Sequence, residues 1–539
     1  MTPLRLKARV QGLTGIASLL FVLSLANAST AAAQVAVTTY HYDNYRTGWN
    51  SHETLLTPTK VASASFGLLS TVTLDDQVDA QPLLVPNVNI TAGTWPGKHD
   101  VVYVVTGNDT VYAIGATTGD ILLKQSLGKP VRWPQGCLQN GPNVGITSTP
   151  VIDLASNTLY VMAYTQDATG PAYRLHALDL GGLTDKMPPR LVTASHTLSD
   201  GTTFVFNATH QRQRPGLLLS DGYIYAGFGS FCDFSANVSR GWLLGWNATS
   251  LAPLSANEVL DVQPTSPNSY FLSSIWMSGA AVAADDSDNV VFVTGNSDPS
   301  GTTYDGVSNI QESVVKTSSD LSTVMDLFTP SNQPTLDEND WDFGSGGVLV
   351  LPDQPGSTPH LAVAAGKDGN MYLMNEDNFG GHSPMKNNVL GSYEIGRCLC
   401  GESYFVDPKD GAARVVSSGA RTVILWKLNT SPKPALGRVS TSPKIVNGQG
   451  AGFFTSVSSS GKANPIIWAV SRPASPMSKG ISLYAFNPDS GGNIMTQLFR
   501  GFAGTWPYFA AHSNLVPIVA NGKVYVASYK QLAIFGLKP

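Results

Sequence analysis

The stretch VVYVVTGNDTVYAIGATTGD, from Val101 to Asp120, carries the pattern on which the fold prediction rests. An apolar strand with an aromatic residue at its centre is followed by a polar turn, a second apolar strand and a turn residue. Short apolar runs that are separated by turns containing Gly or Asn indicate antiparallel strands. The stretch therefore predicts two neighbouring strands of one sheet.

The same pattern returns at intervals of roughly 50 to 70 residues along the chain. A period of this length suits a blade of four antiparallel strands in a β-propeller. We therefore expect an all-β, eight-bladed β-propeller, with seven blades as the alternative if the weak repeat at Val416 is an insertion. The central residues of the repeated strand are Tyr103, Tyr160, Tyr225, Phe292, Ala362, Val416, Trp468 and Tyr525.

The two ends of the repeat region predict how the ring closes. The last repeat stops after three strands at Leu537, and an apolar stretch from Phe66 to Leu74 precedes the first complete repeat. If this stretch supplies the missing strand, neither end leaves an open sheet edge. We expect a signal peptide over residues 1–33, an N-terminal latch segment over 34–65 and a single propeller domain over 66–539.

The first residues have the layout of a secretory signal peptide. Arg5, Lys7 and Arg9 precede an apolar run from about Leu13 to Ala26, which small residues follow. The run is short for a bilayer span, and no other long apolar run exists. We expect an exported monomer, periplasmic or extracellular, with no transmembrane span in the mature chain. A net charge of -5 without a basic run excludes nucleic acid as a partner.

Four cysteines, Cys137, Cys232, Cys398 and Cys400, are an even set that export would allow to be oxidised. Three pairings are open. A bond between Cys398 and Cys400 would close a very small ring, so the pair Cys137 and Cys232 is preferred. The chain has no adjacent Cys-Cys pair and no Cys-x-x-Cys-His haem motif.

Several motifs resemble the PQQ-binding-like (quinoprotein-type) β-propeller repeat family. STPVID from Ser148 and VYVVTGNDTVYAIGATTG from Val102 are similar to its blade repeats, and YHYDNYRTGWN from Tyr40 is similar to the opening latch of exported bacterial members. The family holds both quinoprotein dehydrogenases and cofactor-free proteins. The resemblance implies the propeller fold over nearly the whole mature chain, and it implies PQQ with calcium as cofactors if the chain is an enzyme.

Candidate site residues lie where the innermost strand of each blade opens, because these positions face the central axis. Asp342 and Glu402 are the candidate catalytic bases, Arg214 could pair with an anionic group and Trp276 could stack on a flat ring. No metal ligand is assigned, and the alternative is that these residues line a solvated channel. The acidic run from Thr335 to Gly344 is expected to be a solvated loop. The other candidate cofactor-binding residues are Asp79, Gln81, His512 and Asn514.

Two functions follow from the sequence. The favoured one is an exported binding or scaffold module that holds a small molecule or a protein through its loop face and axial channel. The alternative is a PQQ- and calcium-dependent oxidoreductase of alcohols or sugars. Departures from the dehydrogenase pattern favour the first, because the outer strand AIGATTGDILL from Ala113 lacks the final Trp and the adjacent cysteines are missing.

Overall fold

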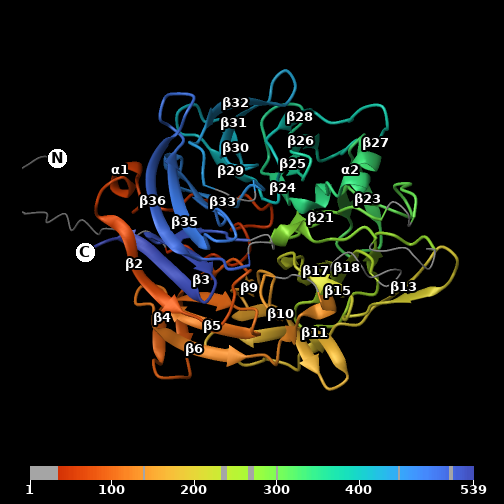
Figure 1. Ribbon diagram of the computed structural model, residues 1–539, viewed down its shortest axis with the longest axis horizontal. Helices are drawn as coiled ribbons and strands as arrows, with labels where there is room; N and C mark the ends of the chain where they lie inside the picture. Colours follow the sequence, from red (N-terminus) through yellow and green to blue (C-terminus); the bar gives the residue numbers. More distant parts are fainter. Residues whose placement is uncertain are drawn as a thin grey trace, which may run out of the picture. The chain divides into compact units, whose positions relative to one another are not determined.

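Eight small sheets follow one another around a ring in the computed structural model (Figure 1). They belong to one compact unit, Gln34–Pro539. Each sheet has at least four strands, paired almost entirely antiparallel, so the predicted eight-bladed β-propeller is confirmed. The structure describes residues 34–136, 140–231, 239–264, 272–298, 302–446, 450–508 and 514–539.

The first four blades each run outward from an innermost strand, which has two or three residues in blades 2 to 4 and eight in blade 1. Blade 3 has an additional inner strand, β15, and blade 4 adds β27 at its outer edge. Blade 1 is β3 (Leu83–Ile90), β4 (Gly97–Val105), β5 (Thr110–Gly115) and β6 (Ile121–Ser126); blade 2 is β9 (Val151–Asp153), β10 (Thr158–Asp167), β11 (Gly170–Asp179) and β12 (Arg190–Leu191); blade 3 is β15 (Gln211–Gln213), β16 (Leu218–Ser220), β17 (Tyr223–Ser230), β18 (Trp242–Asn247) and β19 (Glu258–Val259); blade 4 is β20 (Ala283–Ala284), β21 (Val290–Val293), β22 (Val314–Thr317), β23 (Val324–Thr329) and β27 (Gly381–His382).

The other four blades include the weak repeat at Val416, which lies in the second strand of blade 6. The seven-blade alternative is therefore wrong. Blade 5 is β24 (Val348–Leu351), β25 (Leu361–Ala365), β26 (Asn370–Asn375) and β28 (Gly391–Glu394); blade 6 is β29 (Ser403–Val406), β30 (Ala413–Ser417), β31 (Ile424–Asn429) and β32 (Ala435–Thr441); blade 7 is β33 (Thr455–Ser460), β34 (Ala463–Val470), β35 (Gly480–Asn487) and β36 (Thr496–Thr505); blade 8 is β37 (Ile518–Ala520), β38 (Lys523–Ser528), β39 (Gln531–Leu537) and β2 (Phe66–Thr73).

Helical segments are few and short, and none in the described part of the chain has the length and apolar character that crossing a membrane requires. Several stand between blades, close to the axis. The remaining elements are α1 (Pro58–Val61), α2 (Gln333–Asn339), η1 (Pro134–Gly136), η2 (Met277–Gly279), η3 (Phe343–Ser345), and the short strands β1 (Trp49–Asn50), β7 (Val131–Arg132), β8 (Asn143–Val144), β13 (Ser195–Thr197) and β14 (Thr203–Val205).

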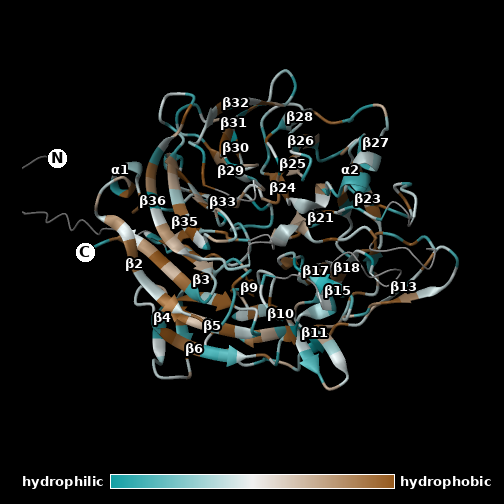
Figure 2. Cartoon of the chain, viewed as in Figure 1, coloured by the Kyte–Doolittle hydropathy of each residue, from teal (hydrophilic) through white to brown (hydrophobic). Residues whose placement is uncertain are grey.

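The hydrophobic core is a ring of clusters that lie between neighbouring blades. One cluster joins blades 1 and 2 around Tyr103 and Leu159, and another joins blades 8 and 1 around Tyr525 and Val102. Figure 2 shows apolar residues along the strands and hydrophilic residues in many of the loops. All eight repeated central residues lie in second strands, where both faces pack on neighbouring blades.

Ring closure occurs as the sequence predicts. Strand β2 pairs antiparallel with β39, with Phe66 opposite Leu537 and Val72 opposite Leu532. Strand β2, from the start of the propeller, thus becomes the fourth strand of its last blade. The outer edge of β39 is therefore paired and does not stay open.

Within the latch segment, residues 37–50 hydrogen-bond to the innermost strand of every blade. These residues are called the latch from here on. Val37 exchanges two backbone hydrogen bonds with Leu84 of blade 1, and β1 runs parallel to β33 of blade 7. The segment therefore passes the inner strand of each blade in turn, around the axis. Its further bonds are from Ile152 N to Thr38 O (blade 2), Asn44 Nδ2 to Leu219 O (blade 3), Ala284 N to Asn44 O (blade 4), Val350 N to Tyr45 O (blade 5), Tyr404 N to Thr47 O (blade 6) and Asn50 Nδ2 to Val519 O (blade 8).

Candidate functional site

A cluster of charged and aromatic side chains lies just before the inner strands begin. Arg214 directly follows β15, Trp276 precedes η2, and Asp342 lies between α2 and η3. Lys367 comes from the turn between β25 and β26. We call these four residues the axial cluster. The latch pairs with residues within the inner strands. Arg214, Trp276 and Asp342 precede inner strands, and Lys367 binds Asp342 from a neighbouring turn, so the latch forms the floor beneath the cluster.

Trp276 is the centre of the axial cluster. The guanidinium carbon of Arg214 lies 5.6 Å from its ring centroid, and Nζ of Lys367 lies 5.4 Å from it. Both distances are within the range of cation–π attraction. The indole Nε1 donates to Asp342 Oδ1 at 3.2 Å. The ring is only partly buried, so it still offers an aromatic surface between two cations.

Asp342 is held as a buried carboxylate. Lys367 Nζ lies 2.5 Å from its Oδ2, and the backbone N–H of Asn296 donates to its Oδ1 at 3.0 Å. Burial alone would raise the pKa of Asp342, but the Lys367 ammonium outweighs burial and lowers it below its ordinary value. Burial likewise opposes the charge of Lys367, while Asp342 and the more exposed Asp340 raise its pKa. Asp342 is therefore ionised at neutral pH.

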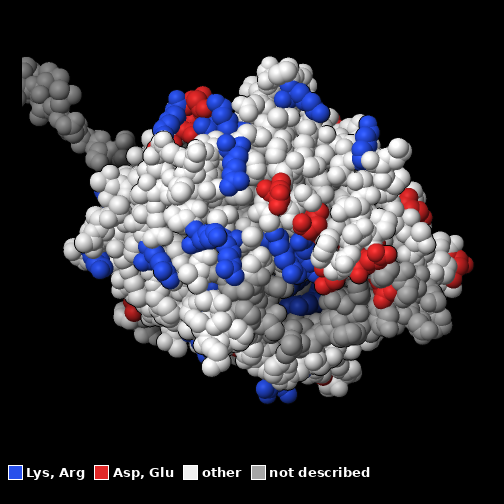
Figure 3. Space-filling model, turned by 45° about the horizontal axis from the view of Figure 1, so that its top comes forward, with Lys and Arg blue, Asp and Glu red and all other residues white. Residues whose placement is uncertain are grey.

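Two further arginines act on Arg214. Burial, and then the neighbouring Arg212 guanidinium, lower the pKa of Arg214 to about 9, and Arg472 adds to this effect while Asp79 opposes it. The three guanidinium groups favour an anion on this side of the site. Figure 3 shows lysine and arginine side chains across the middle of one face, with acidic side chains beside them.

Asp79 and Gln81 have different environments although they are close in sequence. Asp79 is buried and accepts a hydrogen bond from Asn140 Nδ2 at 2.5 Å. Burial raises the pKa of Asp79, and the positive charge of Arg214 partly opposes this rise. Gln81 instead binds the latch, since its Oε1 accepts from His41 N at 3.0 Å and its Nε2 donates to Thr39 O at 3.1 Å. The structure therefore places Asp79 beside the axial cluster and Gln81 in the floor.

Asn514 lies against the turn that carries Trp276. A Cβ atom on Gly279, which has a φ of +93°, would stand 2.0 Å from Asn514 Nδ2. Only glycine allows the two segments to approach this closely. Asn514 is buried and belongs to the surroundings of the axial cluster. His512 and the preferred cysteine pair Cys137 and Cys232 lie outside the described residues.

Glu402 is separate from Trp276, Arg214 and Asp342. Its Oε1 lies 3.9 Å from Cys398 Sγ, and its side chain lines a small cavity together with Tyr40 and His41 of the latch. Burial raises the pKa of Glu402 to about 8. The two candidate bases therefore differ: Asp342 contacts the partly buried ring of Trp276 as an anion, and Glu402 lies in the floor as a neutral acid.

Cys398 and Cys400 form a disulfide, which corrects the expectation that so small a ring would not close. Their Cα atoms are 4.9 Å apart, which is within the ordinary range for a disulfide. Neighbouring segments hold the backbone between them, because Leu399 N donates to Ala451 O and Arg472 Nη2 donates to Leu399 O. The spacing of the two cysteines in the sequence could not show these contacts with distant segments, which hold the backbone at Leu399 between the two bonded side chains.

The acidic run from Thr335 to Gly344 also differs from expectation. Most of it is the helix α2 followed by η3, not a solvated loop. Asp337 and Asp342 are buried, and Asp337 Oδ1 accepts a hydrogen bond from Ser297 N at 3.2 Å. Burial raises the pKa of Asp337 to about 7. Carboxylates that bond to neighbouring loops thus build the wall behind the axial cluster.

Comparisons with known proteins agree with this architecture. The family model described as outer membrane protein assembly factor BamB matches residues 59–169. The quinohemoprotein alcohol dehydrogenase of Comamonas testosteroni is similar in structure, with a TM-score of 0.58 and 12% identity, over 94% of this chain and 81% of that chain. The chain has the same fold as these quinoprotein β-propellers.

Two further solved structures resemble this propeller. The quinohemoprotein alcohol dehydrogenase ADHIIG of Pseudomonas putida HK5 gives a TM-score of 0.59 at 13% identity and covers 93% of this chain and 80% of that one. A europium-containing methanol dehydrogenase gives 0.57 at 9% identity and covers 93% and 98%. A comparison with curated proteins found no match. At these identities the likeness establishes the fold alone, so function must be argued from the site.

Among its four residues, the axial cluster offers one carboxylate, that of Asp342, as a possible calcium ligand. Among the described residues, one group of three acidic, histidine or cysteine side chains brings its ligand atoms within 4.8 Å, namely Cys398, Cys400 and Glu402. The two sulfurs of that group are already bonded to each other. In the axial cluster, Asp342 is paired with Lys367. Calcium prefers six to eight oxygen ligands, and the described side chains do not gather such a set of carboxylates there.

Lys367 is the residue of the axial cluster that sequence reasoning missed. The candidate residues were predicted at the openings of the innermost strands, whereas Lys367 lies in the turn between the second and third strands of blade 5. The signal that could have found it is the turn GKDGN from Gly366, where a lysine replaces the usual small or polar residue. Arg212 and Arg472 were missed as well, because each lies some residues away from an expected opening.

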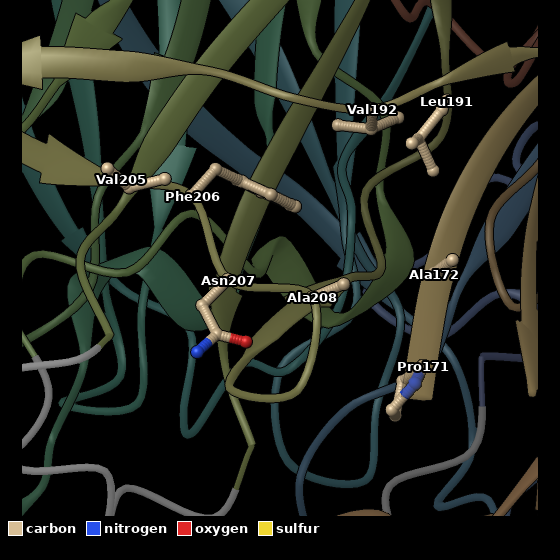
Figure 4. A pocket seen from close by; sticks show the side chains of 8 residues that line it. All are labelled: Pro171, Ala172, Leu191, Val192, Val205, Phe206, Asn207 and Ala208. Carbon is tan, nitrogen blue, oxygen red and sulfur yellow. The ribbon is translucent and has the colours of Figure 1, made fainter. Parts of the chain in front are cut away.

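A separate pocket lies between blade 2 and residues 205–208, which precede blade 3 (Figure 4). It has a volume of about 320 Å³ and is lined almost entirely by apolar side chains. It lacks charged lining residues, in contrast to the axial cluster. Its lining residues are Pro171, Ala172, Leu191, Val192, Val205, Phe206, Asn207 and Ala208.

Proposed function

We propose that this PQQ-type propeller is an exported binding protein that holds a small, flat, anionic molecule at the axial cluster. The observation that carries the proposal is the partly exposed ring of Trp276 between the cations of Arg214 and Lys367. An aromatic ligand gains stacking energy on the indole, and its acidic groups gain ion pairs with the neighbouring cations.

Access to this site is one-sided. The latch hydrogen-bonds to the inner strand of each blade and forms the floor below Trp276. A ligand would therefore enter from the loop face, where the segments before the inner strands lie. The floor also removes water from one side of the cluster, which strengthens each charge interaction within it.

The test is a fluorescence and calorimetric titration of the purified mature protein with flat aromatic polycarboxylates, including PQQ, in the presence of a calcium chelator. We expect saturable binding that Trp276→Ala weakens at least tenfold. Trp95→Ala is the matched control, because Trp95 is exposed and lies outside the cluster. Absence of saturable binding across the panel, or equal binding by the Trp276→Ala variant, would overturn the proposal.

The second candidate function is a PQQ-dependent oxidoreductase, and the ionised carboxylate of Asp342 beside Trp276 favours it. Trp276, Arg214 and Lys367 would hold the quinone, which when bound would accept the two electrons of an alcohol oxidation. Asp342 would then take the proton of the substrate hydroxyl at its carboxylate, because Lys367 keeps that carboxylate charged. Dye reduction with alcohols or sugars that Asp342→Asn abolishes would support this candidate.

Export and the monomeric state are parts of the proposal that rest on the sequence. Cleavage within the first 33 residues would leave the latch at the new N-terminus. Amino-terminal sequencing of protein recovered outside the cytoplasm would test the cleavage, and light scattering would test the monomer. An intact N-terminus in the exported fraction would contradict the predicted signal peptide.

A further inference from the structure

Three buried polar atoms belong to residues that line a small cavity in the floor of the propeller. They are Tyr40 OH, His41 Nε2 and Glu402 Oε2, and among the described residues none of them has a hydrogen-bond partner. The cavity has a volume of about 10 Å³. All three side chains are almost fully buried, so bulk water does not satisfy these atoms. Unsatisfied polar atoms in such a place cost free energy unless something binds them.

The hydrogen on His41 can be assigned from its other nitrogen. Nδ1 lies 3.2 Å from the carbonyl oxygen of Arg46, which can only accept, so Nδ1 carries the hydrogen. Burial lowers the pKa of His41 to about 3, so the ring is neutral. Nε2 is therefore an acceptor that faces the cavity. The ring stacks on Tyr40 at 4.2 Å, which fixes its orientation.

Glu402 faces the cavity as a potential donor. Its Oε1 contacts Cys398 Sγ, which is bonded to Cys400 and carries no hydrogen to donate. Arg46 is the one charged side chain among the described cavity-lining residues, and its guanidinium nitrogens already donate to Val282 O, Thr39 Oγ1, Tyr40 O and Asp43 O. The latch contributes Tyr40 and His41 as the other titratable groups, and the lining residues of blade 5 and of the turn at Ala280 contribute none.

We propose that one internal water molecule occupies this cavity, bound by Glu402, Tyr40 and His41, and that it ties the latch to the floor of the axial site. The cavity has about the volume that one water needs, and three polar partners are the usual number for a buried water. The water donates to His41 Nε2 and accepts from the protonated Glu402 carboxyl or from Tyr40 OH. The water thus links Glu402 to Tyr40 and His41 of the latch, which are distant from it in sequence.

A consequence is that the latch responds to the charge of Glu402. A neutral carboxyl can donate to the water, whereas an ionised one would have as its one charged neighbour among the described lining residues Arg46, whose guanidinium nitrogens already donate to other acceptors. Ionisation would therefore loosen the contact between blade 6 and residues 40 and 41. Burial raises the pKa of Glu402 to about 8, so this loosening would begin in mildly alkaline solution.

Hydrogen exchange of the latch amides, measured from pH 6 to pH 10 and corrected for intrinsic exchange, tests the coupling. In the unaltered protein we expect the protection of the amides of residues 37–50 to fall at least tenfold above about pH 8. Glu402→Gln keeps a donor and an acceptor and cannot ionise, so its latch protection should not change with pH. Equal pH dependence in both proteins would overturn the coupling, as would protection that stays constant in both.

A crystal structure of the mature protein tests the water itself. A single density peak within hydrogen-bonding distance of Glu402 Oε2, Tyr40 OH and His41 Nε2 is expected, and the same peak should persist in Glu402→Gln. An empty cavity, or a peak with the short contacts of a metal ion, would overturn the proposal. Neither measurement uses a ligand of the axial cluster, so their outcome is independent of the proposed function.

Discussion

At the scale of single residues, the axial cluster depends on one buried ion pair. Lys367 and Asp342 are both largely buried and lie 2.5 Å apart. Removing one partner of such a pair leaves an uncompensated charge, whereas removing both does not. The pair therefore matters for stability as well as for any ligand at Trp276.

We expect Lys367→Met to lower the free energy of unfolding by about 3 kcal/mol or more. Asp342→Asn should have a smaller cost, and the double variant should lose less than the sum of the two single losses. Denaturant titration of the four proteins measures this coupling. Additive losses would contradict a direct interaction between the two side chains.

Burial of Glu402 predicts how stability depends on pH. Its pKa is raised to about 8, above the ordinary 4.5, so the folded protein keeps a proton that the unfolded chain has lost. Its contribution is therefore largest below about pH 4.5 and falls by at most about 1.4 kcal/mol per pH unit up to about pH 8. Denaturation of the protein and of Glu402→Gln from pH 5 to 9 should show stability curves that diverge as the pH rises. Parallel curves would contradict the burial of an acid here.

Gly279 tests the close approach to Asn514. We expect Gly279→Ala to destabilise the fold by more than 1 kcal/mol, because its Cβ would collide with the Asn514 amide in addition to the strain of a positive φ. Gly201→Ala is the matched control, since Gly201 has a φ of +85° and nothing within 4 Å of the added carbon. Thermal unfolding of both variants separates collision from backbone strain. Similar losses would show that the contact carries no weight.

At the scale of elements, the closing strand β2 joins residues from opposite ends of the chain. Its inward residue Val72 is buried and lies opposite Leu532, whereas Thr71 faces solvent. We expect Val72→Pro to cost about 3 kcal/mol or more, because proline removes a ladder hydrogen bond and cannot fill the apolar site. Thr71→Ala should change stability by less than about 0.5 kcal/mol. Denaturant titration decides, and equal effects would mean that β2 contributes little to closure.

Elements were easier to predict from the sequence than the site was. The repeated central residues identify all eight second strands, because a strand with both faces buried must be continuously apolar. The closing role of β2 followed from counting strands at the two ends. Helix α2 was missed because its residues read as a solvated acidic run, and their burial depends on bonds to loops far away in sequence. The disulfide and Lys367 were missed for the same reason, since tertiary contacts set their positions.

At the scale of the whole molecule, the axis of the propeller is divided into two parts. The latch fills the part beside the inner strands, and the axial cluster occupies the part before them. The latch therefore closes one side of the predicted axial channel. No sequence pattern could show this, because the latch bonds largely through backbone atoms that any residue supplies.

The contacts of the latch also set the order in which the molecule can be completed. Residues 37–50 are synthesised long before one of their partners, since Asn50 and Val519 are 469 residues apart in sequence. Strand β2 likewise precedes its partner β39 by seven blades. The latch and β2 must therefore wait, without these partners, until blade 8 has been made. The ring cannot close blade by blade during synthesis, and loss of blade 8 would leave the latch and β2 unassembled as well.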